Sequence, residues 1–142
     1  MSAVLEVKGL TVDIPVAAGD LHAVRGIDFS VDKGETLCIV GESGCGKSVT
    51  ALSLMGLLPM PPLELVSGRA LFDGEDLLRL SATQMSEIRG DRISMIFQEP
   101  MTSLNPVYRI GDQIAEVVLR HRDVTKAEAR ARAREMLERV KI

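Results

Sequence analysis

A glycine-rich segment offers the clearest chemistry in this chain. The eight residues 41–48 read Gly-Glu-Ser-Gly-Cys-Gly-Lys-Ser, which matches the spacing G-x-x-x-x-G-K-[ST]. Its three glycines let the backbone turn tightly and leave no Cβ beside a bound phosphate chain. Lys47 is placed to contact the β- and γ-phosphates of a nucleotide, and the Ser48 hydroxyl to ligate a bridging Mg²⁺. The spacing therefore predicts a nucleotide phosphate loop.

The predicted phosphate-binding set combines this loop with the start of the element that follows it. Successive backbone N–H groups can point into one concavity, aided by the positive end of the next helix. The Cys45 side chain is not needed for binding. It is either a small tolerated residue or a thiol made acidic at a helix terminus, where alkylation would block the loop. The predicted cofactor-binding residues are Gly41, Glu42, Ser43, Gly44, Cys45, Gly46, Lys47, Ser48 and Val49.

The segments that flank the loop predict the elements that would hold it in place. Residues 35–40 are mostly apolar and partly β-branched, which is typical of a buried strand. Residues 49–58 are rich in Leu, Ala, Ser and Met and predict a helix that ends at Pro59. A strand, a glycine loop and a helix in this order are the context in which the motif forms a binding site.

The rest of the chain alternates between predicted strands and helices, which indicates an α/β protein. Turn residues at 32–34 and 73–74 separate some of the strands, and two helices open with capping-box spacing at Ser81–Gln84 and Thr125–Glu128. Gly90 is placed to close the first of these helices. The predicted strands cover 5–12, 24–31, 67–72 and 92–97, and the longer helices cover 110–122 and 125–140.

Composition excludes several other classes of protein. The 142 residues are 46% hydrophobic and 26% charged, which is enough to form one sizeable core or slightly less. Two cysteines do not make a disulfide framework or a metal site. No apolar run reaches the roughly 18 residues of a membrane span, and the N-terminus does not have the pattern of a signal peptide. We therefore expect a soluble globular chain in the cytoplasm.

Charge is uneven along the chain. The net charge is −3, yet eight basic and four acidic side chains lie between Arg120 and Ile142. Such a segment could be a nucleic-acid patch. However, Glu128 and Arg132, like Glu135 and Arg139, have the i,i+4 spacing of ion pairs on a solvated helix. The solvated face is the favoured interpretation, and we expect no nucleic-acid partner.

A second tract makes a family resemblance specific. Residues 95–106 read Met-Ile-Phe-Gln-Glu-Pro-Met-Thr-Ser-Leu-Asn-Pro, and 110–114 read Ile-Gly-Asp-Gln-Ile. Together with the loop at 41–48 and the stretches at 5–12 and 23–30, they resemble the ATPases of ABC transporters. Within that superfamily the chain is most similar to the bacterial oligopeptide, dipeptide and nickel importers. The resemblance covers the whole chain.

The resemblance implies the fold of the N-terminal portion of an ABC ATPase, which is a P-loop NTPase. It would comprise an antiparallel β subdomain, part of a RecA-like core and the start of the helical subdomain. The implied domains are a nucleotide-binding lobe over 1–97, a Q-loop over 98–109 and the start of the helical subdomain over 110–142. The family's signature motif, its acidic strand and its switch histidine do not occur in this sequence. We therefore expect a piece of a longer subunit that is inactive alone.

The resemblance also implies cofactors and partners. The cofactors would be ATP and Mg²⁺, with Ser48 and Gln98 as metal ligands and Gln98 also positioning the attacking water as an accessory to catalysis. The partners would be membrane subunits that dock on the Q-loop region, a second ATPase subunit and, indirectly, a periplasmic solute-binding protein. The complete subunit would hydrolyse ATP and drive peptide import from the cytoplasmic face of the bacterial inner membrane.

Three points stay open at this stage. The chain could belong to another ABC system, such as an exporter, although the 98–106 tract speaks against this. It could also be a nucleotide-binding module without catalysis. The family normally stacks an aromatic ring on adenine after its first strand, but residues 12–16 contain no aromatic residue. Ile14 offers an apolar face there, and His22 is a weaker candidate.

Overall fold

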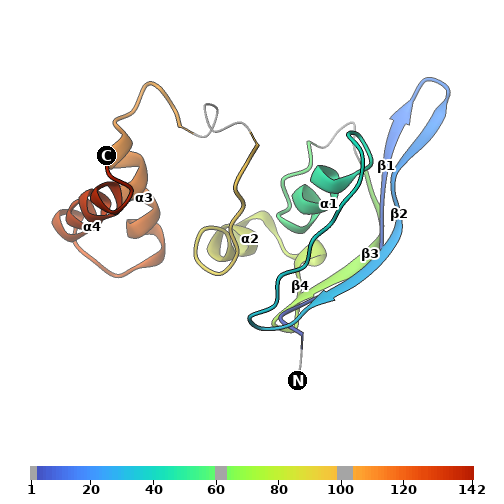
Figure 1. Cartoon of the computed structure of the whole chain (residues 1–142), viewed down its shortest axis with the longest axis horizontal. Coiled ribbons are helices and arrows are strands. Elements are labelled where there is room, and N and C mark those ends of the chain that lie inside the picture. Colours follow the sequence, from blue (N-terminus) through green and yellow to red (C-terminus); the bar gives the residue numbers. More distant parts are fainter. Residues whose placement is uncertain (1–2, 60–63, 99–103) are drawn as a thin grey trace. The chain divides into compact units, whose positions relative to one another are not determined.

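The computed structural model describes residues 3–59, 64–98 and 104–142 (Figure 1). Contacts divide the chain into two compact units, Met1–Ser86 and Glu87–Ile142. The assignment of 1–97, 98–109 and 110–142 to separate lobes stays a prediction. In chain order the elements are β1 (Leu5–Val16), β2 (Gly19–Val31), α1 (Lys47–Leu54), β3 (Glu64–Phe72), β4 (Glu75–Asp76), the 3₁₀ helix η1 (Leu77–Arg79), α2 (Ala82–Ile88), α3 (Ile110–His121) and α4 (Lys126–Arg139).

The first unit is built on an antiparallel sheet with the strand order β2-β1-β3-β4. β1 pairs with β2 through a two-residue hairpin loop after Val16, and its other edge pairs with β3. The predicted turn at Asp73 and Gly74 joins β3 to β4, with Phe72 opposite Glu75. The predicted strands at 5–12, 24–31 and 67–72 are thus confirmed, each longer than the sequence pattern indicated.

The core of this unit lies between one face of the sheet and the two short helices beside it. α1 contacts β1, β2 and η1. Along β1 the buried side chains are Val7, Leu10 and Val12. Leu10 and Val12 follow the period-two alternation of a strand, and a register shift between Val7 and Leu10 accounts for the three-residue step before them. Across the core lie the buried Leu54 of α1 and Leu77 of η1. This packing fixes α1 against β2, the strand beside the glycine loop.

Helix α1 ends earlier than Pro59, and its hydrogen bonds give the reason. Gly56 adopts a left-handed conformation with φ 58°. Its N–H donates to the Ser53 carbonyl at 3.0 Å, and Leu57 N–H donates to the Leu52 carbonyl at 2.8 Å. These two bonds form a Schellman motif, which closes a helix at a glycine. The sequence prediction missed this stop because it gave the proline priority over the glycine.

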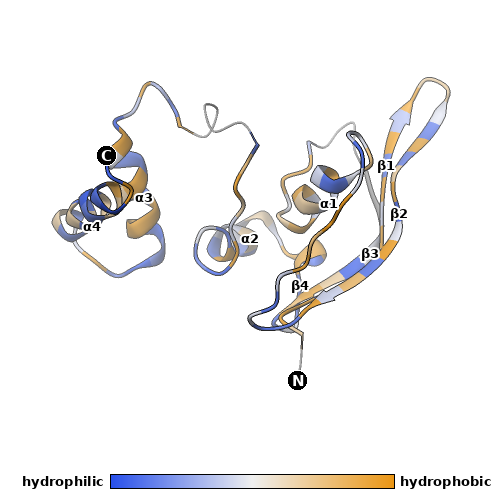
Figure 2. Cartoon of the chain, in the orientation of Figure 1, coloured by the Kyte–Doolittle hydropathy of each residue, from blue (hydrophilic) through white to orange (hydrophobic). Residues whose placement is uncertain are grey.

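Two predicted strands are wrong. The segments predicted as strands at 35–40 and 92–97 form no strand in the described structure, although Ile93 makes one isolated parallel bridge with Arg89. Val40 is 88% exposed and Ile96 is 98% exposed. Figure 2 shows the apolar colour of the segment that follows α2. Strands of parallel sheets are buried between neighbouring strands, and within the described residues nothing pairs with these segments. The prediction identified the apolar composition of these segments correctly, but the neighbouring strands that a buried strand requires are not found among the described residues.

The second unit is a helical hairpin preceded by a turn. α3 and α4 match the predicted helices at 110–122 and 125–140 to within one residue at each end. Their contact is made by small side chains, since Ala115, Ala129 and Ala133 are buried between them. The predicted capping box is present. Thr125 Oγ1 accepts from Glu128 N–H at 3.3 Å, and Glu128 Oε2 accepts from Thr125 N–H at 2.7 Å.

Candidate phosphate-binding loop

Helix α1 begins inside the glycine loop. Its first residue is Lys47, two residues before the predicted start, and its N-cap is Gly46 with φ 95°. Gly46 supplies no side chain to cap the free N–H groups, and the first turn contains no acidic residue. The N-terminus of a helix carries partial positive charge. Uncapped and unneutralised, this terminus is suited to an anion.

Gly46 also sets how closely the loop approaches the sheet. A Cβ at this position would lie 2.4 Å from the carbonyl oxygen of Ala23 in β2. Such a distance is well below van der Waals contact, so any larger residue would push the loop away from the strand. The glycine pattern identified this position as permissive, but only the structure shows that the neighbouring backbone belongs to β2.

The Lys47 ammonium is held over the loop by backbone oxygens. Lys47 Nζ donates to the carbonyl of Gly41 at 2.7 Å and to that of Glu42 at 2.7 Å. Its third contact is with the Cys45 sulfur at 3.4 Å. A thiol sulfur is a weak acceptor, so a phosphate oxygen would replace it at little cost. The ammonium is therefore positioned by strong contacts and still able to bind an anion.

An open pocket extends from the glycine loop along β2. Its volume is about 570 Å³, and its lining includes Gly44, Lys47, Val24 and Ile39. The polar side chains of α1 do not compete for a ligand there. Thr50 Oγ1 donates to the carbonyl of Gly46 at 3.0 Å, and Ser53 Oγ donates to a carbonyl one turn earlier at 2.7 Å.

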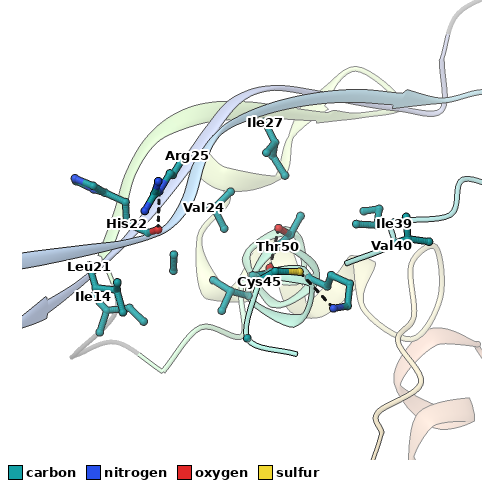
Figure 3. A pocket seen from close by; sticks show the side chains of 15 residues that line it. Ile14, Leu21, His22, Val24, Arg25, Ile27, Ile39, Val40, Cys45 and Thr50 are labelled. Atoms are coloured by element: carbon teal, nitrogen blue, oxygen red, sulfur yellow. Dashed lines mark hydrogen bonds between the residues drawn. The ribbon is translucent and has the colours of Figure 1, made fainter. Parts of the chain in front are cut away.

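Apolar side chains line the end of this pocket that is formed by β1 and β2. Figure 3 shows Ile14 and Leu21 together on the side of the strands that faces α1, with His22 and Arg25 on the other side. His22 Nδ1 lies 2.8 Å from Asp13 Oδ1. Because its ring is bonded to Asp13, His22 is the weaker candidate for the apolar surface at this end of the pocket. Ile14 and Leu21 provide that surface together. The sequence analysis missed Leu21 because strand register, not spacing, pairs it with Ile14.

The remaining predicted site residues are divided between the two units of the chain. The loop residues 41–49 are contiguous, and Ser48 is exposed on the first turn of α1. Gln98 is exposed and belongs to the second unit, so its role as a metal ligand stays a prediction. Of the tract expected to dock a partner, Leu104 is 45% exposed, while Met101 lies outside the described residues.

Comparison with known proteins assigns the class to which this fold and loop belong. The family described as ABC transporter matches residues 24–142, and the chain belongs to that family. Solved structures show the same fold. A dimeric, post-hydrolysis structure of the ATP-binding cassette MJ0796 bound to ADP and Pi superposes with a TM-score of 0.80 at 22% identity, covering 94% of this chain and 56% of the other.

Curated relatives are similar over the whole chain. The oligopeptide transport ATP-binding protein OppD of Bacillus subtilis (strain 168) is 50% identical over 142 residues, and the dipeptide transport ATP-binding protein DppD of the same organism is 51% identical over 142 residues. OppD of Escherichia coli (strain K12) is 47% identical over 140 residues. The chain spans about 40% of the length of these relatives. Among the described residues, the helices are too short or too polar to cross a bilayer.

Proposed function

We propose that this chain binds the phosphates of ATP at the loop 41–49. The observation that carries the proposal is the Lys47 ammonium, which two backbone carbonyls hold at 2.7 Å beside an uncapped helix terminus. Charge, donor geometry and helix dipole all favour an anion at this point. The Gly46 position supports it as well, because a side chain there would occupy the space between loop and strand.

Mg²⁺ would accompany the nucleotide. The family resemblance implies two ligands for it, the exposed hydroxyl of Ser48 and the amide oxygen of Gln98, which is a hard donor of the kind that Mg²⁺ prefers. When bound, the ion neutralises charge on the phosphates. The base would rest on Ile14 and Leu21, which are apolar but without a π-face. We infer weaker selection among bases than an aromatic ring provides.

For the complete protein we propose the ATPase subunit of a bacterial peptide importer. Identities of 47–51% to oligopeptide and dipeptide transport ATP-binding proteins support this. In that role two ATPase subunits pair, and their hydrolysis of ATP drives two membrane subunits that dock on the Q-loop region at the cytoplasmic face. A periplasmic solute-binding protein delivers the peptide. Dimeric structures of another cassette with the same fold are consistent with pairing.

Replacing Lys47 tests the binding proposal. We expect Lys47→Ala to weaken ATP binding by ~2–3 kcal/mol, the typical loss of a charged hydrogen bond. The measurement is a calorimetric titration of the chain with ATP and Mg²⁺. The matched control is Lys33→Ala, which removes an exposed lysine from the turn before the loop. Equal ATP affinity in the wild type and Lys47→Ala would sink the proposal.

A further inference from the structure

The pocket beside the phosphate loop ends at a ribbon of two strands. β3 pairs with β1 only as far as Asp13, whose partner in β3 is Glu64. Beyond that pair, among the described residues, β1 has only β2 beside it, and the two form a ribbon over 14–21 (Figure 1). A two-stranded hairpin is marginally stable by itself, so the geometry of this ribbon depends on a few cross-strand contacts. Those contacts matter because Ile14 and Leu21 of the ribbon line the pocket.

A β-bulge at Ala23 sets which side chains of β2 face the pocket. Val24 lies opposite Val12, but the next pair along the strands joins His22 to Asp13. Ala23 is therefore the additional residue of the bulge. Because side chains of a strand alternate between its two faces, one additional residue exchanges the faces of all the side chains that follow it.

The bulge thus exchanges two side chains of β2. With the bulge, Leu21 lies opposite Ile14. Figure 3 shows the His22 ring on the other side of the ribbon from these two residues. In a register without the bulge, His22 would lie opposite Ile14 and bring a polar ring to the pocket side. The register of this ribbon therefore selects between an aliphatic and a polar surface for a ligand.

One side-chain contact belongs to the bulged register alone. Asp13 Oδ1 lies 2.8 Å from His22 Nδ1, and the side chain of Asp13 is only 15% exposed. In the register without the bulge, Asp13 would lie opposite Ala23, whose methyl group forms no bond with a carboxylate. The contact between Asp13 and His22 is therefore made only when Leu21 faces the pocket.

We propose that the Asp13–His22 pair is a positioning pair that selects the bulged register and so presents Leu21 to the base of a bound nucleotide. This role rests on the proposed binding of ATP, whereas the selection of the register does not. A surface that is already formed binds a planar base with less loss of conformational freedom. The pair acts through the ribbon and takes no part in the phosphate loop.

Methyl NMR of the free chain tests the register. Cross-strand partners have Cβ atoms about 4.5–5.5 Å apart, so Ile14 and Leu21 should show a methyl–methyl NOE. We expect Asp13→Ala to weaken this NOE and Asp13→Asn to retain it, because the amide oxygen still accepts from the imidazole. Asp20→Ala, which removes the same charge from an exposed position of the ribbon, is the matched control and should retain it. An undiminished NOE in Asp13→Ala would overturn the selection of the register.

Titrations with ATP and with inorganic tripolyphosphate separate the base from the phosphates. Asp13→Ala should weaken ATP binding roughly twofold to fivefold, the range of a cross-strand pair, and leave tripolyphosphate binding unchanged. The double variant with His22→Ala should bind ATP no more weakly than either single variant, because one substitution already breaks the contact. Equal losses for ATP and tripolyphosphate, or additive losses in the double variant, would overturn the positioning role.

Lys47→Ala distinguishes a failure of this role from a failure of the phosphate loop. It should weaken the binding of both ligands, since both carry the phosphates. If the wild type and Lys47→Ala bind tripolyphosphate equally, the phosphate loop is wrong and the positioning role falls with it. If Lys47→Ala weakens both ligands while Asp13→Ala weakens neither, the proposed function stands and the positioning role is wrong.

Discussion

The three N–H donors of the Lys47 ammonium group control how the loop binds an anion. Two of them bind carbonyls of the loop itself, at Gly41 and Glu42, and the third faces the Cys45 sulfur. The two carbonyl contacts fix the direction of the Lys47 side chain before any ligand arrives. Preorganised charge of this kind binds an anion without the cost of ordering a long flexible side chain. Cys45, which the sequence analysis took as dispensable, is a weak and replaceable partner in that arrangement.

At the same scale, Gly46 gives a prediction about the loop and the sheet together. Gly46→Ala should destabilise the chain by about 1–3 kcal/mol and abolish ATP binding, because its Cβ would meet the Ala23 carbonyl at 2.4 Å. The measurements are a urea denaturation midpoint and an ATP titration. Gly74→Ala is the control, since Gly74 has a similar φ of 88° and nothing within 4 Å of its Cβ position. A Gly46 variant as stable as the Gly74 variant would show that the close approach is not constraining.

At the scale of elements, the capping box of α4 couples helix stability to pH. The pKa of Glu128 lies below its ordinary value because the backbone N–H and then the hydroxyl of Thr125 bond its carboxylate, with Arg132 adding attraction. A carboxyl with a depressed folded pKa stabilises above the unfolded pKa and loses this contribution as pH falls through the folded value. The capping contribution should therefore be fully present above the ordinary glutamate pKa and decline progressively as pH falls below it through the lower folded pKa.

Circular dichroism of the chain during acid titration measures this effect. We expect Glu128→Gln to remove part of the helix loss seen on acidification, since Gln cannot change charge. Glu135→Gln, at an exposed position of the same helix, is the control and should leave the acid transition unchanged. Identical acid transitions for wild type and Glu128→Gln would contradict the role of this carboxylate.

The elements also show how far the sequence predicts this structure. The helices α3 and α4 were predicted closely because capping residues and periodicity are local signals. The antiparallel strands were predicted from alternation and turn residues for the same reason. The strand predicted at 35–40 was wrong because a parallel strand forms only beside neighbouring strands, and the local sequence pattern carries no information about those neighbours. Likewise, the motif 41–48 located the phosphate loop, whereas Leu21 was missed because strand register places it beside Ile14.

At the scale of the whole molecule, we predict binding without turnover. The 142 residues contain no family signature motif and no acidic strand that could supply a catalytic carboxylate. Without a general base and without enclosure of the γ-phosphate, the attacking water is not activated. Phosphate release assays on the purified chain should show no hydrolysis above background at saturating ATP and Mg²⁺. Multiple turnover that disappears in Lys47→Ala, which excludes a contaminating ATPase, would refute this.

Two apolar segments have no strand partner among the described residues. Val40 is 88% exposed and Ile96 is 98% exposed. Exposed apolar backbone that is not paired favours association edge to edge. A solution of the isolated 142 residues should therefore self-associate as its concentration rises, through segments that take no part in the phosphate loop.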